Sequence, residues 1–282
     1  MYKLVAFDLD GTLLNDEKKI IDKNLNIIHN LMENGVEVII STGRGYTSCE
    51  GLVKSIKDDI TCICNNGAIA RTLHSYDEIF ATYMNPSEVE KILYLADKVG
   101  TTPLIHVNGF YDKIDVVYRE DNIKFTPENR NKNSSLRYKE INSYNDYHFN
   151  DVLALAFFDD KIKTKELYEE TKKIYNEGFS YHFMENTSSD NSLVEYMAKD
   201  INKWNGIKKY AKLKSISEEE IIVFGDDNND YEMIKNAKVG VAMSNAARSR
   251  SGAIFFVWLV LDKLEYLEKF RMQNLGDSTA RL

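Results

Sequence analysis

Two aspartates separated by one residue, Asp8 and Asp10, follow the first apolar run of the chain, residues 4–7, and precede Gly11. In open α/β sheets, ligands bind beyond the carboxyl ends of the strands, which is where this pair falls. One carboxylate could attack phosphorus or carbon to form a covalent intermediate, and the other could give and take a proton. Aspartate is also a common turn and helix-cap residue, so the pair alone fits a solvated loop at least as well.

A second acidic turn follows another apolar run, residues 222–224, and contains Asp226, Asp227 and Asp230. Carboxylates this close in the chain repel one another and therefore favour a bound cation. Oxygen ligands without a neighbouring cysteine or histidine are typical of a hard ion, and Mg²⁺ beside a phosphate is the usual case. An acidic surface turn is the alternative, but it does not explain why both acidic turns follow strands.

Two further residues lie where a phosphate could be bound. Thr42 follows the apolar run 36–40, and its hydroxyl and the neighbouring backbone N–H groups could form an anion-binding turn. Lys203 precedes a segment of helical spacing. Each is weak evidence alone, because threonine is a common helix cap and a single lysine is usually a surface charge.

The elements that would position these residues follow from hydrophobic spacing. Apolar runs at 4–7, 36–40 and 60–64 predict strands, and apolar residues between the first two runs recur at helical spacing up to a C-cap at Gly35. A strand, a helix and a strand in this order predict a right-handed βαβ unit in a parallel sheet. After Lys203 the pattern returns, with strands expected at 221–224 and 239–243.

The segment between these two parts has a different pattern. Asn85 and Pro86 predict the N-cap and first residue of a helix. Four strands and a second helix are expected at residues 102–107, 115–118, 153–158, 181–184 and 165–175. Asn108-Gly109 suits a hairpin turn between the first two of these strands, and the polar segment 128–150 is expected to be loop.

Together these patterns predict an α/β fold, in which a Rossmann-like domain with a parallel sheet is split by an inserted α+β domain with an antiparallel sheet. The expected parts are residues 1–83 and 200–282 for the split domain and residues 84–199 for the insertion. The length of 282 residues fits two domains of ordinary size.

The composition excludes several classes of protein. Hydrophobic residues at 43% and charged residues at 28% are typical of a globular chain. The net charge of −8 argues against general binding to nucleic acid or an anionic membrane. Any anionic substrate must therefore be bound by a local site. The longest apolar run, residues 253–261, is shorter than the roughly 20 residues of a membrane span, and no signal peptide is expected. Three cysteines favour a reducing, cytoplasmic compartment.

The motifs resemble the haloacid dehalogenase-like (HAD) hydrolase superfamily, in particular its Cof-type members, whose large α+β cap (type C2B) is inserted between the second and third motifs. The resemblance covers residues 1–247 and rests on five short segments. These are DLDGTLL at 8–14, STGR at 41–44, NNG at 65–67, GDDNND at 225–230 and VGVAMSNA at 239–246.

The resemblance implies catalytic roles for the first two aspartates. Asp8 would be the nucleophile that becomes an aspartyl phosphate, while its other oxygen binds Mg²⁺. Asp10 would protonate the leaving alcohol and then activate water, with its backbone carbonyl facing the metal. Members of the superfamily that keep their phosphoaspartate lack an aspartate at this place, so Asp10 favours hydrolysis.

The remaining motif residues would bind the phosphate and the metal ion. Thr42 and Lys203 would bind the phosphoryl oxygens, and Asn229 would orient the phosphate or a water on the metal. Asp226 would complete the metal site, with Asp230 beside or behind it.

The sequence therefore predicts a Mg²⁺-dependent phosphatase of small phosphorylated metabolites, such as sugar phosphates, that acts through an aspartyl phosphate. A phosphomutase of the same superfamily is an alternative, which a requirement for a bisphosphate activator would reveal. A module that binds a phosphorylated ligand without turnover is another, which metal-dependent phosphate release would exclude. Neither the physiological substrate nor the oligomeric state can be read from the sequence.

The carboxyl-terminal stretch departs from the family pattern. After Ala246 the family shows an acidic, lysine-rich helix, a short strand and an Asp-Gly turn, whereas this chain continues with ARSRSG and the apolar run 253–261. We expect that run to be a strand and residues 263–270 a closing helix, with residues 274–282 frayed. An exposed apolar patch for self-association is the alternative.

Overall fold

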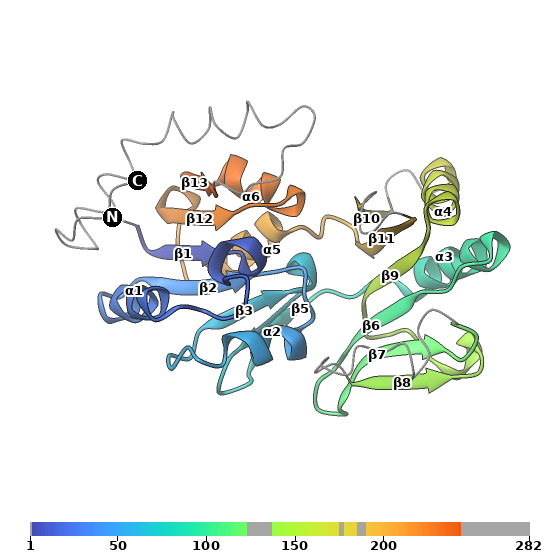
Figure 1. Cartoon of the computed structure of the whole chain (residues 1–282), viewed down its shortest axis with the longest axis horizontal. Helices are drawn as coiled ribbons and strands as arrows, with labels where there is room; N and C mark the ends of the chain where they lie inside the picture. Colours follow the sequence, from blue (N-terminus) through green and yellow to red (C-terminus); the bar gives the residue numbers. More distant parts are fainter. Residues whose placement is uncertain (1, 123–136, 175–177, 185–189, 244–282) are drawn as a thin grey trace. The chain divides into compact units, whose positions relative to one another are not determined.

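A computed structural model describes residues 2–122, 137–174, 178–184 and 190–243 (Figure 1). The chain forms two compact units: a split unit, Met1–Phe80 with Asn202–Leu282, and an inserted unit, Ala81–Ile201. Within the described ranges, no helix has the length and hydropathy that crossing a membrane would require. The strand and helix expected at 253–261 and 263–270 lie outside the described residues.

The split unit contains one seven-stranded sheet, in the order β13-β12-β1-β2-β3-β4-β5. Its strands are β1 Leu4–Phe7, β2 Glu37–Ser41, β3 Thr61–Cys64, β4 Ile69–Thr72, β5 Glu78–Ala81, β12 Ile221–Gly225 and β13 Val239–Ala242. From β13 to β3 the neighbouring strands are parallel, and β4 pairs antiparallel with β3. Parallel neighbours end at the same edge, so the residues that follow β12, β1 and β2 lie beside one another (Figure 1).

Helices pack against this sheet. In the described part of the split unit the α-helices are α1 Asp22–Glu33, α2 Tyr46–Val53, α5 Lys203–Leu213 and α6 Tyr231–Asn236. Trp204 and Ile207 of α5 are buried in one cluster with Leu4 of β1 and Val223 of β12. This burial anchors the first turn of α5, which contains Lys203, to the central strands. Gly35 follows α1 with a φ of 75°, as expected for a residue that ends a helix.

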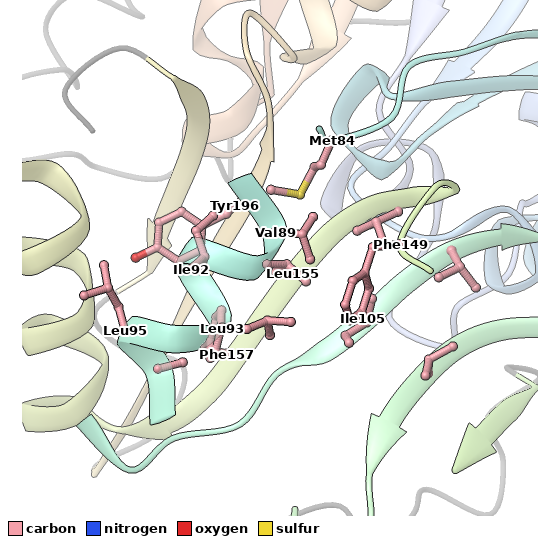
Figure 2. Packing of buried hydrophobic residues seen from close by; sticks show 14 of the residues in the cluster. Met84, Val89, Ile92, Leu93, Leu95, Ile105, Phe149, Leu155, Phe157 and Tyr196 are labelled. Atoms are coloured by element: carbon pink, nitrogen blue, oxygen red, sulfur yellow. The ribbon is translucent and has the colours of Figure 1, made fainter. Parts of the chain in front are cut away.

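The inserted unit contains a six-stranded sheet, in the order β10-β11-β9-β6-β7-β8. Its strands and helices are β6 Leu104–Gly109, β7 Ile114–Arg119, β8 Tyr138–Ile141, β9 Val152–Asp160, β10 Phe179–Met184, β11 Asn191–Ala198, α3 Pro86–Val99 and α4 Lys161–Ile174. The strands pair antiparallel except β7 and β8, which are parallel. Figure 2 shows side chains of α3, such as Ile92 and Leu93, packed with Ile105, Leu155 and Phe157 of the sheet.

The predicted fold class is confirmed, and so is the start of α3. The side chain of Asn85 accepts a hydrogen bond from the backbone N–H of Ser87, with Pro86 as the first helical residue. This cap satisfies one of the free N–H groups at the helix start.

Two local expectations for the inserted unit are wrong. Residues 128–136 of the polar segment expected to be loop lie outside the described residues. In the remainder, residues 137–150, β8 pairs with β7 and buries Ile141. This one apolar side chain gives too little periodicity to reveal a strand. Asn108-Gly109 is not the hairpin turn, because a register shift between His106 and Gly109 lets β6 continue to Gly109. The turn follows at residues 110–113. A further strand, β11, was not among the strands expected from the sequence.

Candidate active site

The predicted site residues of the split unit gather at the carboxyl edge of its sheet. Asp8 directly follows β1, Thr42 follows β2 and Asp226 follows β12, and these strands are neighbours. Lys203 is the first residue of α5, with Asn202 as N-cap accepting from the backbone N–H of Asn205. The capped helix end places the lysine beside the strand ends.

Lys203 bridges two carboxylates in the interior. Its ammonium nitrogen lies 2.6 Å from Oδ1 of Asp8 and 2.6 Å from Oδ1 of Asp230, and the side chain is 1% exposed. Burial alone would lower the pKa of Lys203, but the charges of Asp230 and Asp8 outweigh it and raise that pKa. The lysine is therefore a permanent cation between the two carboxylates.

Asp8 is the buried carboxylate at the end of β1. Burial, the largest influence, raises the pKa of Asp8 to about 7, and the nearby charge of Asp230 acts in the same direction. Lys203 opposes this shift through its charge and its hydrogen bond. A further cation at this site would favour the ionised, nucleophilic form of Asp8.

Asp230 anchors the acidic turn from inside. Its Oδ2 accepts hydrogen bonds from the backbone N–H groups of Asp226 and Asp227, at 2.9 and 3.0 Å. Gly225 is required here, because a Cβ at that position would lie 2.6 Å from the carboxyl carbon of Asp230. The turn is thus fixed by a buried carboxylate that also contacts Lys203.

Asp8, Asp226 and Asp230 form a group that could hold a metal ion. Each offers a carboxylate oxygen, and these oxygens lie within 4.8 Å of one another. The donors are all oxygens, so the set fits a hard divalent cation. Burial raises the pKa of Asp226, and a 2.8 Å hydrogen bond from Thr12 Oγ1 to its Oδ1 opposes that shift.

Asp10 is placed differently from the other aspartates. Its carboxylate accepts two hydrogen bonds from Arg44, Nε to Oδ2 at 2.5 Å and Nη2 to Oδ1 at 2.7 Å, and one from Lys18 at 2.8 Å. Partial burial would raise the pKa of Asp10, but these hydrogen bonds and charges outweigh it and lower the pKa to about 2. The sequence motif STGR contains Arg44 but indicates no contact with Asp10, and no sequence pattern indicated the contact of Lys18.

Thr42 and Asn229 are connected through Asn66, which sequence reasoning placed in a turn without a role. The backbone N–H of Asn66 donates to the carbonyl of Thr42 at 3.0 Å, and Asn229 Nδ2 donates to Asn66 Oδ1 at 3.0 Å. Thr42 is buried, and its hydroxyl accepts from the backbone N–H of Arg44 at 3.2 Å. The buried Oδ1 of Asn229 has no hydrogen-bond partner among the described residues, so it is available to a ligand.

The arrangement at this edge combines an acidic group, a buried lysine and a turn with hydroxyl and amide groups. Comparison with known proteins decides its family, because the model of the haloacid dehalogenase-like hydrolases matches residues 5–256. The chain belongs to the haloacid dehalogenase-like hydrolase family.

Relatives within this family are phosphatases. The chain is 30% identical over 244 residues to the 5-amino-6-(5-phospho-D-ribitylamino)uracil phosphatase YcsE of Bacillus subtilis, covering 86% of this chain and 84% of that protein. A second phosphatase of the same name from that organism, YitU, is 26% identical over 242 residues, covering 86% of each chain. As a haloacid dehalogenase-like hydrolase with such relatives, this chain is an enzyme that hydrolyses phosphate esters.

A solved structure shows the same fold. A haloacid dehalogenase-like hydrolase from Bacteroides thetaiotaomicron matches with a TM-score of 0.72 at 21% identity, covering 88% of this chain and 90% of that chain. The acidic group Asp8, Asp226 and Asp230 agrees with the use of a metal ion that is general in this family.

Proposed function

We propose that this phosphatase is Mg²⁺-dependent and hydrolyses small phosphorylated metabolites, such as sugar phosphates or similar phosphomonoesters, through an aspartyl phosphate on Asp8. The observation that carries the proposal is the buried contact of Lys203 with Asp8 and Asp230 beside the acidic group. A carboxylate nucleophile, a fixed cation and a set of hard oxygen donors are the parts that phosphoryl transfer needs.

In the first step, a carboxylate oxygen of Asp8 forms a bond to phosphorus while the bond from phosphorus to the leaving oxygen breaks. This step requires the protonated form of Asp10, which donates its proton to that oxygen, so the alcohol leaves neutral. In the second step, a water attacks the phosphorus of the aspartyl phosphate and Asp10 takes up its proton. Asp8 is released as a carboxylate together with inorganic phosphate.

The phosphoryl oxygens would be bound by chain groups fixed before the substrate arrives. Lys203 supplies a buried positive charge, and Thr42 and Asn229 supply a hydroxyl and an amide group. Groups held in place in a site with little water stabilise transition-state charge more than mobile groups do.

Mg²⁺ would be held by Asp8, Asp226 and Asp230, with the backbone carbonyl of Asp10 as a further ligand. When bound, it supplies positive charge that neutralises the phosphoryl oxygens. When all are ionised, Asp8, Asp10, Asp226 and Asp230 carry four negative charges. Three cations, Lys203, Lys18 and Arg44, offset three of these charges. A divalent ion would leave the site with one net positive charge before a phosphate dianion binds.

We further propose that selectivity for the leaving group resides in the residues 84–199, between the core parts 1–83 and 200–282. Two relatives are named as phosphatases of a phosphorylated ribitylamino compound, which is a primary alkyl phosphate. A small polyol phosphate of that kind belongs in the first test. The three buried, free cysteines support activity in a reducing, cytoplasmic compartment.

The test is phosphate release from a broad panel of phosphorylated metabolites with Mg²⁺, with the wild type beside Asp8→Asn. We expect release from a few related esters and its loss in the variant. Release that persists in Asp8→Asn would disprove the nucleophile. Turnover that requires a bisphosphate activator and yields an isomer, rather than phosphate, would disprove the hydrolase mechanism in favour of a mutase.

A further inference from the structure

The carboxylate of Asp10 is held by two cations from different segments. Arg44, in the turn after β2, forms two parallel hydrogen bonds with it, and Lys18, in the loop after residues 9–13, contacts Oδ1 alone. In the reaction described above, the two cations offset charge but take no part in either step. Both must nevertheless affect what Asp10 does, because they contact the oxygens that would carry its proton.

Arg44 is itself fixed by the turn that holds the phosphate-binding residues. Its backbone carbonyl accepts from the N–H of Asn65 at 2.9 Å, and its backbone N–H donates to the hydroxyl of Thr42. Its Nη1 donates to the hydroxyl of Ser48 at 3.3 Å. The guanidinium therefore has a defined position relative to Thr42. Its hydrogen bonds to Asp10 fix the carboxylate relative to the same turn.

Most N–H groups of the Arg44 guanidinium already donate within the chain. Of its five N–H groups, the Nε–H and one on Nη2 donate to Asp10, and one on Nη1 donates to Ser48. A two-point contact fixes both the place and the plane of a carboxylate, which a lysine ammonium cannot do. This geometry suits orientation of Asp10 better than direct binding of a phosphate.

Lys18 is the weaker of the two contacts. Its side chain is 54% exposed, against 34% for Arg44, and it meets only one oxygen. Its backbone adopts a φ of 58°, in the left-handed region that is uncommon for a residue other than glycine. The backbone conformation that places this ammonium beside Asp10 is therefore somewhat strained.

We infer that Arg44 is a positioning residue that orients the carboxyl of Asp10 toward the leaving oxygen of the substrate, with Lys18 as a weaker second support. The inference rests on the proposed function, because it assumes that Asp10 transfers the proton. Loss of Arg44 should therefore impair proton transfer by Asp10 and leave phosphate binding intact.

Leaving groups of different basicity test this selectivity. A poor leaving group, such as the alkoxide of an alkyl phosphate, needs protonation as its bond to phosphorus breaks, whereas p-nitrophenolate leaves without it. We expect Arg44→Gln to lower kcat/KM for alkyl phosphates by about 100-fold, within the range of general acid catalysis, and that for p-nitrophenyl phosphate only a few-fold. KM should change little for either ester.

Arg44→Lys keeps the charge but loses the two-point contact, so it should also lower kcat/KM for alkyl phosphates more than for p-nitrophenyl phosphate, by a smaller factor.

Lys18→Ala should show only a few-fold effect on alkyl phosphates, because an exposed ion pair contributes little. Its matched control is Lys19→Ala, which removes an exposed lysine paired with Glu17 and should behave as the wild type. Adding Arg44→Gln to Asp10→Asn should cause no further loss, because both remove one function.

Three results would each overturn the proposed role of Arg44 and leave the proposed function unaffected. Equal losses on every ester would indicate a structural role, a raised KM with unchanged selectivity would indicate substrate binding, and unchanged kinetics would remove any role. The proposed function fails separately, if phosphate release persists in the Asp8→Asn variant. Arg44→Lys, which preserves the charge, keeps the test decisive if Arg44→Gln does not fold.

Discussion

Lys203 and Asp8 are 195 positions apart in the chain, yet the ammonium of the first lies 2.6 Å from a carboxylate oxygen of the second. The two elements that carry them, α5 and β1, share one buried apolar cluster through Trp204 and Leu4. The apolar packing of the split unit therefore has a direct chemical consequence, because it brings a lysine that is only 1% exposed to the carboxylate proposed as nucleophile.

Replacing Lys203 by Met should both destabilise and inactivate the enzyme. The variant leaves Asp8 and Asp230 buried without their cation, which should cost about 3–5 kcal/mol in the free energy of unfolding. Loss of a fixed charge at the phosphate should lower kcat by about 100-fold or more. Urea unfolding and phosphate release measure the two effects. Lys212→Met, on the exposed side of the same helix, should change neither.

A double variant separates the charge effect from packing. Asp8→Asn combined with Lys203→Met should be less destabilised than the two single variants predict together, because the carboxylate that lacked a partner is gone. If the two losses simply add, the contact between Lys203 and Asp8 contributes nothing specific to stability.

The acidic group of Asp8, Asp226 and Asp230 predicts a selective response to loss of one proposed metal ligand. Chelation should abolish phosphate release, and Mg²⁺ should restore it. Asp226→Asn keeps the acceptor for Thr12 but removes a charge, so the Mg²⁺ concentration for half-maximal activity should rise about tenfold or more. Asp227→Asn is the matched control, because Asp227 lies outside the acidic group and its carboxylate accepts from the N–H of Asn228. An equal response of both variants would contradict the assignment.

The convergence of the acidic turns could be predicted from the sequence, because residues that follow neighbouring parallel strands must meet at one edge of the sheet. The apolar runs before Asp8, Thr42 and Asp226 were enough to place them together. Lys203 had little support from its local sequence, since a single lysine before a helix is usually exposed. Its burial depends on contacts with Asp8 and Asp230 that no local pattern contains.

Side-chain partners were the less predictable part of the site. The pairing of Asp10 with Arg44 joins residues 34 positions apart and depends on the rotamers of both. Asn66 was recognisable as a turn residue, but its hydrogen bond to Asn229 spans 163 positions. Such contacts follow from tertiary packing, whereas periodicity and turn chemistry report only local preference.

His106 of β6 should make stability sensitive to acid. Burial lowers the pKa of His106 below its ordinary value of 6.5, although the charges of Glu195 and Asp115 oppose this. The unfolded chain therefore binds a proton at His106 that the folded protein excludes, so the free energy of unfolding should decrease as pH falls below 6.5. Urea unfolding across this range should show a smaller decrease in His106→Gln. His148→Gln, at an exposed histidine of the same unit, should follow the wild type.

Gly11 and Gly35 offer a matched pair for testing how closely the backbone approaches the acidic group of Asp8, Asp226 and Asp230. Both have positive φ, 80° and 75°, so replacing either by alanine should cost about 1–2 kcal/mol in backbone strain. A Cβ at Gly11 would lie 2.1 Å from Oδ2 of Asp226, whereas a Cβ at Gly35 would meet nothing within 4 Å. Gly11→Ala should therefore lose activity and require more Mg²⁺, because Asp226 must move, while Gly35→Ala should lose only stability. Phosphate release at several Mg²⁺ concentrations, beside urea unfolding, measures both, and full activity in Gly11→Ala would show that Asp226 can move without consequence.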